Sequence, residues 1–385
     1  MKAEVAIVGG GVIGASIAWH LARAGMKDIV IVDRAMGSGE GSTGKATGGF
    51  RAQFATSINV RLSLMARDAL LRFKDEHGVD PGYQQVGYLW LASSESEMES
   101  IRAAQRIQRA EGLAEVRELA HSDITVINPL VVAGDLVGGA FCPTDGYIKP
   151  LEILRGYLES ATKLGVRVMW GAECTGMRRD ANRRISRLET TEGDVDVDTV
   201  VNAAGAWAAR IASMAGVSLP VTALRRQAAF TEPCAGIPAD KPMTIFMPSG
   251  FHIRARDGRA LICWPNPEEP GAPDHLVADP KWIDAVTAMA RSRVPLLREV
   301  EVDRSLCYAG LYEMSPDDHA LIGRMPACEN MYFANGSSGH GVMHSPAIGA
   351  IVADMIVGNE PQLDVNELRP SRFAENQPIA AAELI

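Results

Sequence analysis

The chain has 385 residues, of which 47% are hydrophobic and 22% are charged, a composition typical of globular proteins with a sizeable core. This length exceeds what one small core accommodates, so we expect two intimately joined domains. A net charge of −9 argues against a broad nucleic-acid-binding surface, because such a surface needs a basic face to neutralise phosphates. A small anionic substrate is not excluded, since one arginine inside an acidic protein can bind a carboxylate.

The cysteines form no C-x-x-C pair and no His/Cys cluster, so we expect no metal site and no disulfide framework. They are Cys142, Cys174, Cys234, Cys263, Cys307 and Cys328. A reduced, cytoplasmic protein is the simplest interpretation. The apolar stretch after Lys2 is interrupted by Glu4 and by the glycines of residues 9–14, which favours a strand and a turn over a signal peptide. No run approaches the roughly 18 apolar residues that a bilayer span needs.

The N-terminal segment carries a glycine-rich fingerprint. Residues 4–8 predict a buried parallel strand, which leads into Gly9-Gly10-Gly11-Val12-Ile13-Gly14 and a helix-period segment to Ala24. A second strand over residues 29–32 ends in Asp33. This G-x-G-x-x-G pattern in a strand–turn–helix–strand context predicts a dinucleotide site, but it does not distinguish FAD from NAD.

Each part of the fingerprint has an expected task. Gly9 allows a tight turn, Gly11 allows close approach of a pyrophosphate, and Gly14 allows close packing of the helix on the strand. The helix N-terminus offers free N–H groups to phosphates. Asp33 is suited to bind ribose hydroxyls.

Residues 37–51 form a loop of small and hydroxylated residues that ends in Phe50 and Arg51. Composition alone equally permits a linker. Because the loop follows Asp33 directly, we expect it over the same phosphates, where side chains from the loop would add hydrogen-bond donors. These are Ser42, Thr43, Lys45 and Thr47.

The remaining elements alternate along the chain. Helix-period stretches lie near 58–76, 95–112, 151–164, 281–293 and after the turn 336–343; strand-like runs lie at 86–91, 166–178 (two strands), 197–201, 228–231, 243–247, 251–255, 260–264, 305–309 and 332–334. Strands that cluster between 220 and 315 predict a mixed or antiparallel sheet. We therefore expect an α/β fold with a discontinuous Rossmann-type domain and a second, substrate-binding domain. The Rossmann-type domain would comprise 1–85, 145–220 and 315–372, the substrate domain 86–144 and 221–314, and the tail 373–385. The loop 265–280 is not placed by its sequence.

Several motifs occur together in one order. They are the fingerprint, the loop STGKATGGFR at 42–51, Asp145-Gly146-x-x-x-Pro150, NAAGAW at 202–207 and Gly339-His340-Gly341. In this combination the chain resembles the D-amino-acid-oxidase-like FAD oxidoreductases from about residue 3 to residue 372. Within that family it is most similar to glycine oxidase, sarcosine oxidase and the β subunits of sarcosine oxidase and proline dehydrogenase.

The resemblance implies FAD as the cofactor. It implies noncovalent binding, because Gly310 replaces the cysteine that holds flavin in monomeric sarcosine oxidase and Gly44 replaces the histidine of other relatives. Cys174 would be a non-reactive contact through its backbone, and backbone N–H groups of 336–343 would face the flavin carbonyl. The expected cofactor contacts are Gly9, Gly11, Val12, Ile13, Gly14, Asp33, Arg34, Ser42, Thr43, Lys45, Ala46, Thr47, Gly49, Cys174, Ala203, Gly205, Trp207, Gly310, Gly339, His340, Gly341, Val342 and Met343.

The resemblance also implies hydride transfer to flavin from a carbon next to an amine nitrogen, giving an imine. Arg51 is the first candidate for the anchor of a substrate carboxylate, and the alternatives are a surface arginine or one bonded to FAD. His252 stands near the position of an oxygen-activating lysine of sarcosine oxidases, or it is structural. Tyr312 either binds substrate or belongs to the core, and His340 is expected to shape the flavin loop. Met343 replaces a lysine that holds the carboxylate in monomeric sarcosine oxidase.

The leading hypothesis is FAD-dependent oxidation of the C–N bond of a small sarcosine-, glycine- or proline-like amino acid. The same frame would serve a 2-hydroxy acid. A flavin-bearing β subunit that passes electrons to a partner subunit, instead of to O2, is a third hypothesis, and the fingerprint alone permits an NAD-dependent dehydrogenase. We expect no nucleic-acid partner, no membrane span and an open choice between homo- and hetero-oligomers.

Overall fold

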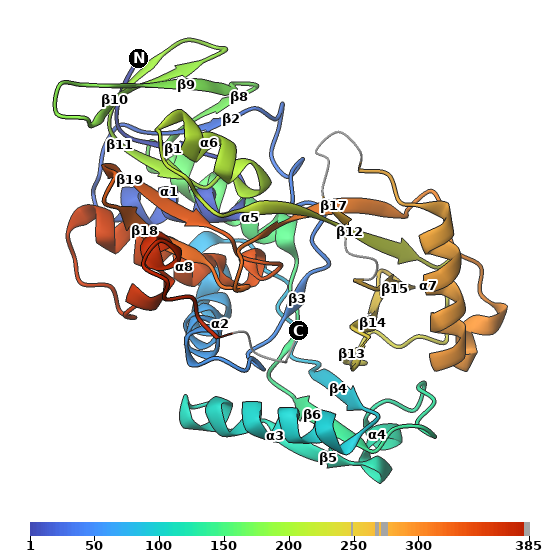
Figure 1. The fold of residues 1–385 in the computed structure, drawn as a ribbon. Coiled ribbons are helices and arrows are strands. Elements are labelled where there is room, and N and C mark those ends of the chain that lie inside the picture. The colour runs from blue at the N-terminus through green and yellow to red at the C-terminus, as the bar shows by residue number, and fades with distance from the viewer. Residues whose placement is uncertain (248, 266–268, 271–275, 381–385) are drawn as a thin grey trace.

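The strands of the chain divide between two large sheets (Figure 1). The computed structural model describes residues 1–247, 249–265, 269–270 and 276–380. The first sheet has the order β18-β19-β11-β1-β2-β8, with the antiparallel pair β9 and β10 joined to β11. Its strands are β1 (Lys2–Val8), β2 (Ile29–Asp33), β8 (Arg167–Trp170), β9 (Cys174–Arg179), β10 (Ile185–Thr190), β11 (Val195–Asn202), β18 (Leu321–Met325) and β19 (Cys328–Asn335).

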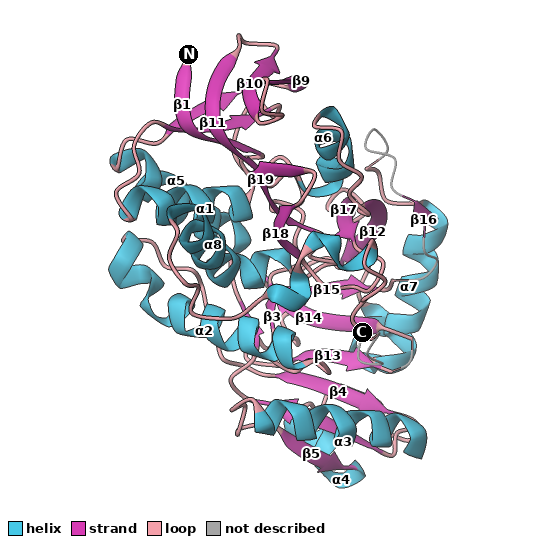
Figure 2. Cartoon of the chain, turned by 60° about the vertical axis from the view of Figure 1, so that its left-hand side comes forward, coloured by secondary structure: helices cyan, strands magenta, loops and turns pink. Residues whose placement is uncertain are grey.

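The centre of this sheet is parallel. β1 pairs in parallel with β2 and β11, and β11 pairs in parallel with β19. The apolar residues of β1 are buried on both faces, as a central parallel strand requires. Four helices pack together on one side of the sheet (Figure 2). They are α1 (Val12–Arg23), α2 (Ser57–His77), α5 (Pro150–Lys163) and α8 (Gly341–Val357).

The second sheet is mixed, as its sequence predicted. Its order is β16-β12-β15-β14-β13-β4-β6-β5. β17 lies outside this order and pairs with β12 along Thr222–Ala228. β13 and β4 are parallel, whereas β12, β14, β15 and β17 pair antiparallel. Its strands are β4 (Tyr88–Ala92), β5 (Arg117–Ala120), β6 (Gly138–Cys142), β12 (Thr222–Phe230), β13 (Met243–Phe246), β14 (Phe251–Arg256), β15 (Arg259–Cys263), β16 (Glu269–Pro270) and β17 (Tyr308–Met314).

Shorter elements complete the fold. α3 (Glu95–Ala110), α4 (His121–Ile127) and α7 (Pro280–Arg293) accompany the second sheet, and α6 (Ala208–Met214) follows β11. The two-stranded ribbon of β3 (Gly49–Phe50) and β7 (Gly146–Tyr147) lies between the sheets. The 3-10 helices are η1 (Gly205–Trp207), η2 (Pro295–Glu299), η3 (Asn366–Leu368) and η4 (Pro370–Phe373).

Local signals in the sequence fix several boundaries. α7 begins at Pro280 after Asp279, whose side chain accepts a hydrogen bond from the Lys281 N–H at 2.9 Å. α2 ends where Gly78 adopts a left-handed conformation with φ of 71°. The four long predicted helices consequently begin and end within two residues of the observed bounds.

One predicted strand, 305–309, is wrong in its first half. Residues 304–306 form a turn, because the Asp303 carboxylate accepts a hydrogen bond from the Ser305 N–H at 3.1 Å. The strand begins at Tyr308 and continues to Met314, so Tyr312 lies inside it. Part of the unplaced loop 265–280 lies outside the described residues.

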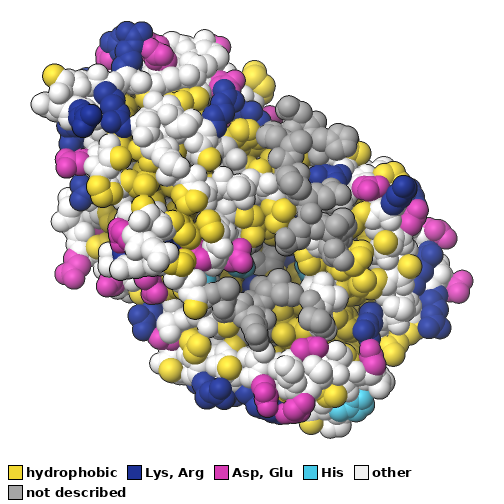
Figure 3. Space-filling view, viewed as in Figure 1, with side chains coloured by type: hydrophobic (Ala, Val, Ile, Leu, Met, Phe, Trp, Pro, Cys, Tyr) yellow, Lys and Arg dark blue, Asp and Glu magenta, His cyan; other side chains and the backbone are white. Residues whose placement is uncertain are grey.

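On the face shown in Figure 3, acidic and basic side chains are interspersed over both halves of the molecule. None of the helices in the described part of the chain combines the length and the apolarity that a membrane crossing demands.

Candidate functional site

A cavity of about 1110 Å³ extends between the two sheets. It begins at the carboxyl ends of β1 and β2, the edge where open parallel sheets bind ligands, and it reaches β12, β14 and β17 of the second sheet. Every candidate site residue predicted from the sequence, except Gly14, lines this cavity. Because single ligand pockets measure about 300–1,000 Å³, this cavity has room for a large ligand and a small one together.

The glycine fingerprint closes one end of the cavity. Gly9 has a φ of +114°, and a Cβ there would lie 2.2 Å from the Ala203 carbonyl oxygen. A Cβ on Gly14 would lie 2.0 Å from the Gly9 oxygen, so Gly14 packs helix against strand below the cavity. Gly11 faces the cavity, and the nearest atom to a Cβ there is Thr43 Oγ1 at 3.3 Å. The turn therefore matches the tasks expected of its three glycines.

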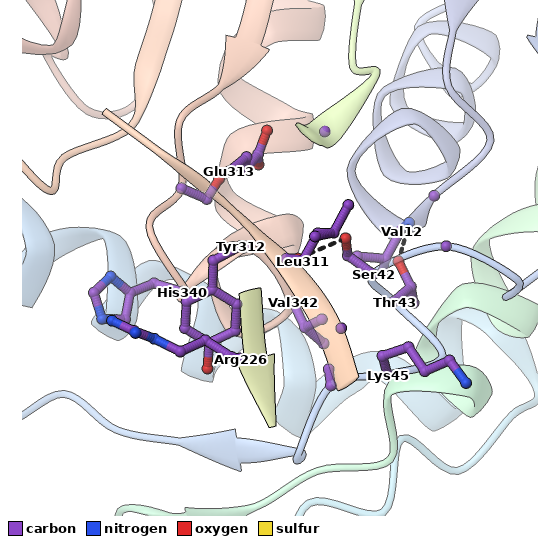
Figure 4. A pocket seen from close by; sticks show the side chains of 18 of the residues that line it. Val12, Ser42, Thr43, Lys45, Arg226, Leu311, Tyr312, Glu313, His340 and Val342 are labelled. Atoms are coloured by element: carbon purple, nitrogen blue, oxygen red, sulfur yellow. Dashed lines mark hydrogen bonds between the residues drawn. The ribbon is translucent and has the colours of Figure 1, made fainter. Parts of the chain in front are cut away.

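The first turn of α1 also faces this space. The Val12 N–H donates to Thr43 Oγ1 at 3.1 Å, which ties the loop after β2 to the helix N-terminus (Figure 4). Free N–H groups and the positive end of a helix dipole favour an anion at such a position. This end of the cavity is suited to bind phosphate groups.

The side chains beyond the fingerprint suit a nucleoside. Asp33 accepts hydrogen bonds from the Gly10 N–H at 2.6 Å and the Ala35 N–H at 2.8 Å, which fix its carboxylate at the end of β2. The Arg34 guanidinium stacks 4.0 Å above the Trp207 ring. Burial raises the pKa of the Cys174 thiol to about 11, so Cys174 remains a neutral, non-nucleophilic thiol.

The loop 37–51 is anchored on the second sheet, which argues against a mere linker. Ser42 Oγ donates to the Leu311 carbonyl at 2.8 Å (Figure 4). The Tyr308 hydroxyl donates to the Lys45 carbonyl at 2.9 Å. The hydroxyl proton of Ser42 is therefore engaged with β17, whereas Thr43 accepts from Val12 and keeps its own proton for another partner.

Arg51 lies at the opposite end of the cavity and is buried. Its guanidinium lies 4.3 Å from the Phe54 ring centre and 5.0 Å from that of Trp90. Burial lowers the pKa of Arg51 to about 10, which still leaves a cation at neutral pH. The surface alternative for Arg51 is wrong, because β4 and the segment after β3 enclose it.

His340 contacts this cation directly. Arg51 Nη2 lies 3.1 Å from His340 Nε2. Because a guanidinium only donates, Nε2 must accept, and the neutral imidazole carries its proton on Nδ1. Burial and the neighbouring Arg51 hold the pKa of His340 well below its usual range, in agreement with a neutral ring.

Asp145 positions the Arg51 segment from behind. Its buried carboxylate accepts from the Ala52 N–H at 2.7 Å and from Gln53 Nε2 at 3.0 Å. Burial raises the pKa of Asp145 to about 6, against the effect of these two donors. The sequence contained the signal in the motif at 145–150, but the site prediction omitted the residue.

His252 and Tyr312 line the same end of the cavity. His252 Nδ1 lies 2.8 Å from the Gly250 carbonyl, so Nδ1 carries the proton and Nε2 presents a lone pair. Loss of water contact lowers the pKa of His252, and the nearby Arg51 and Arg226 lower it further. Enclosure raises the pKa of Tyr312, so its phenol remains a hydrogen-bond donor. The site thus combines a cation, a neutral base and a neutral donor.

The cavity has further polar and aromatic walls that the sequence did not reveal. Tyr88 and Trp90 enter from β4, Arg226 from β12 and Glu313 from β17. In Figure 4, Tyr312, Arg226 and His340 lie on one side of β17, and Ser42, Thr43 and Lys45 lie on the other. The predicted strand ended at 309, so Glu313 lay outside it; in the structure it belongs to β17 and points to the face opposite to Tyr312.

Comparison with known proteins gives one family. The family model described as FAD dependent oxidoreductase matches residues 4–355. Glycine oxidase of Geobacillus kaustophilus (strain HTA426) is 28% identical over 94% of this chain and 95% of its own length. The mitochondrial dimethylglycine dehydrogenase of Rattus norvegicus is 26% identical over 97% of this chain, which spans only 45% of that relative. The crystal structure of L-proline dehydrogenase from P. horikoshii superposes with a TM-score of 0.91 at 27% identity and covers 98% of this chain and 99% of its own.

Proposed function

We propose that this chain, which belongs to the family of FAD-dependent oxidoreductases, oxidises the C–N bond of a small amino acid. The observation that carries the proposal is the buried Arg51 cation, held between Phe54 and Trp90 beside a neutral His252. A guanidinium suits a carboxylate, and a neutral imidazole suits an ammonium proton. The names of the relatives, which include glycine oxidase and dimethylglycine dehydrogenase, support the same class of substrate.

FAD is the family's cofactor, and the residues present fit it. Gly11, Thr43 and the first turn of α1 would hold the pyrophosphate, while Asp33 and the stacked pair Arg34 and Trp207 would hold the adenosine. We therefore assign the cofactor largely to the Rossmann-type domain that contains the first sheet (1–85, 145–220 and 315–372). We assign the substrate largely to the domain that contains the second sheet (86–144 and 221–314). When bound, FAD supplies the acceptor for the hydride.

We propose noncovalent attachment of FAD, and the sterics of the loop support it. A Cβ on Gly44 would lie 1.9 Å from the Gly39 carbonyl oxygen, so a histidine has no room there. Gly310 offers no thiol, and a Cβ there would already lie 2.9 Å from the Lys45 side chain. We propose that no bond from either position reaches the flavin.

In the proposed mechanism Arg51 binds the substrate carboxylate through parallel hydrogen bonds, and His340 holds one edge of the guanidinium in place. His252 Nε2 accepts a proton from the substrate ammonium, which leaves a neutral amine with a lone pair. Tyr312 donates a hydrogen bond to the substrate, and the walls from β4 exclude water. The substrate would then lose a hydride from the carbon next to nitrogen, which leaves an iminium, and one N–H proton of this iminium would pass to water to give an imine. The imine hydrolyses, or it stays cyclic when the substrate is proline-like.

The proposal extends to the electron acceptor. A lysine stands near the position of His252 in the oxygen-activating enzymes that the sequence resembles, whereas the His252 imidazole is neutral in the free protein and carries a charge only while it holds the substrate proton. Because such a charge only transiently stabilises a reduced-oxygen anion, we propose a partner redox protein, instead of O2, as the acceptor. Six free cysteines speak for a reducing, cytoplasmic location as part of the same proposal.

The test is the visible spectrum of the FAD-loaded protein during anaerobic addition of candidate substrates. Sarcosine, glycine, proline, 4-hydroxyproline, N-methyl amino acids and 2-hydroxy acids form the panel. Bleaching by one of the amino acids, and not by hydroxy acids, is the expected result. Bleaching by a 2-hydroxy acid alone would overturn the amine assignment. Slow recovery of the colour in air, with rapid recovery on adding an artificial acceptor, is expected for a dehydrogenase.

A further inference from the structure

Glu313 is a cavity residue for which the proposed mechanism has no use. It lies on β17 next to Tyr312, and because side chains alternate along a strand, the two point to opposite faces. Figure 4 shows Glu313 directed away from the Tyr312 ring. On its side of the strand, η1 packs against β17, and the segment between β19 and α8 approaches through Ser337.

The surroundings of Glu313 are polar and incompletely paired. Among the described residues, three buried side-chain atoms have no hydrogen-bond partner there: Glu313 Oε2, Asn335 Oδ1 and Ser337 Oγ. Burial raises the pKa of Glu313 to about 7, whereas the side chains of Ser337 and Asn335 and the backbone N–H groups of Ser337 and Gly336 favour its ionised form. Each unpaired buried group costs about 1–3 kcal/mol, so three adjacent ones indicate a ligand that supplies hydrogen bonds.

The chemistry of these atoms selects the ligand. A carboxylate and an amide oxygen accept hydrogen bonds, so the ligand must donate them. A phosphate is anionic and would be repelled by Glu313. Leu311, two residues before Glu313, accepts the hydrogen bond from Ser42 of the phosphate-binding loop, whereas Tyr312 faces the substrate end. Glu313 lines the same cavity from the face of β17 opposite to Tyr312.

We propose that Glu313 is a cofactor-binding residue that accepts a hydrogen bond from a hydroxyl of the ribityl chain of FAD. Ser337 and Asn335 complete this polar subsite. The inference rests on the FAD site of the proposed function and not on the identity of the substrate. The part of the cavity beside Glu313 would then bind the ribityl chain, which connects the flavin ring to the pyrophosphate.

The experiment measures binding to the apoprotein by quenching of flavin fluorescence. Glu313→Ala is expected to weaken FAD about 10-fold to 100-fold, as loss of a hydrogen bond to a charged group does. ADP, which lacks the ribityl chain and is measured by its competition with FAD, should bind this variant as it binds the wild type. Glu313→Gln keeps an acceptor oxygen and should lie between the two. Glu329→Ala, a change at an exposed position on β19, is the matched control.

FAD analogues that each lack one ribityl hydroxyl locate the contact. The analogue that lacks the hydroxyl bound by Glu313 should bind wild type about as weakly as FAD binds Glu313→Ala. Its affinity for Glu313→Ala should be little lower than its affinity for wild type. The proposal is overturned if Glu313→Ala binds FAD normally, if FAD and ADP weaken in parallel, or if every analogue loses affinity additively, as a water molecule in the subsite would cause. None of these readouts involves a substrate, so a failure here leaves amine oxidation untouched, and the reverse holds.

Discussion

Replacing Arg51 by alanine removes the cation that we assign to the substrate carboxylate. The guanidinium is buried and fixed by Phe54, Trp90 and His340, so little freedom is lost when a carboxylate binds. Hydrogen bonds to charged groups contribute about 1.5–3 kcal/mol each, and two parallel ones about 3–6 kcal/mol. Since about 1.4 kcal/mol corresponds to a factor of ten, Arg51→Ala should weaken substrate binding by about 10²-fold to 10⁴-fold.

Arg51→Lys separates charge from shape. Lysine keeps the positive charge but cannot form two parallel hydrogen bonds or stack as a plane between two rings. We expect it to lose about 10-fold to 100-fold, less than the alanine variant. The exposed Arg298→Ala is the control for a general loss of charge.

The assay is anaerobic stopped-flow reduction of the bound flavin, which gives a reduction rate and a substrate dissociation constant. The second substrate is a secondary amine without a carboxylate, which wild type should bind weakly and which Arg51→Ala should bind no worse. The reasoning is refuted if both substrates lose the same factor, because a loss that ignores the carboxylate is structural. It is refuted equally if Arg51→Ala keeps the wild-type dissociation constant.

Three further predictions concern other parts of the site. His252→Phe should slow flavin reduction at pH 7 by about 100-fold or more. Above the pKa of the substrate ammonium no proton needs to be accepted, so the difference in rate from wild type should shrink there. A pH profile of the reduction rate checks this, and a difference that stays constant with pH would contradict it. The pKa of Asp145 is raised to about 6 in the folded protein, so folding takes up a proton between about pH 4 and 6. The free energy of unfolding should therefore fall by about 3 kcal/mol as the pH rises through that window. Urea unfolding of the apo wild type and of Asp145→Asn checks this, and the variant should show a flatter pH profile. Gly14→Ala places a Cβ 2.0 Å from the Gly9 carbonyl oxygen, so it should lower the Tm of the apoprotein and abolish FAD retention on a desalting column. The control is Gly134→Ala, an exposed position where a Cβ would have no neighbour within 4 Å, and this variant should retain FAD.

The sequence predicted the parts of the molecule in which function depends on local spacing. The fingerprint could be interpreted because three glycines within six residues each have a steric task, and Gly9 and Gly14 meet that description in the structure. The mixed second sheet followed from strands that succeed one another without long helices. Both inferences needed only neighbours in the chain.

What escaped prediction depends on distant segments. The environment of Arg51 combines Phe54, Trp90 from β4 and His340 from the start of α8, which no spacing in the sequence connects. Glu313 escaped for a different reason. The predicted strand began in the turn that follows Asp303 and stopped at 309, whereas the observed strand continues to Met314 and includes Glu313.

Arg51 has a consequence for how enzymes on this scaffold diversify. The Arg51 guanidinium contacts Trp90 of the second sheet and His340 at the start of α8, which packs on the first sheet. It therefore also connects the two halves of the molecule. Changing it to accept a substrate without a carboxylate would loosen the alignment of the halves at the same time. Variation in substrate preference should therefore accumulate at Arg226 and Tyr312, which lie on the second sheet and leave that connection in place. Directed evolution that randomises those two positions while keeping Arg51 should yield more folded, cofactor-loaded variants than libraries that include it.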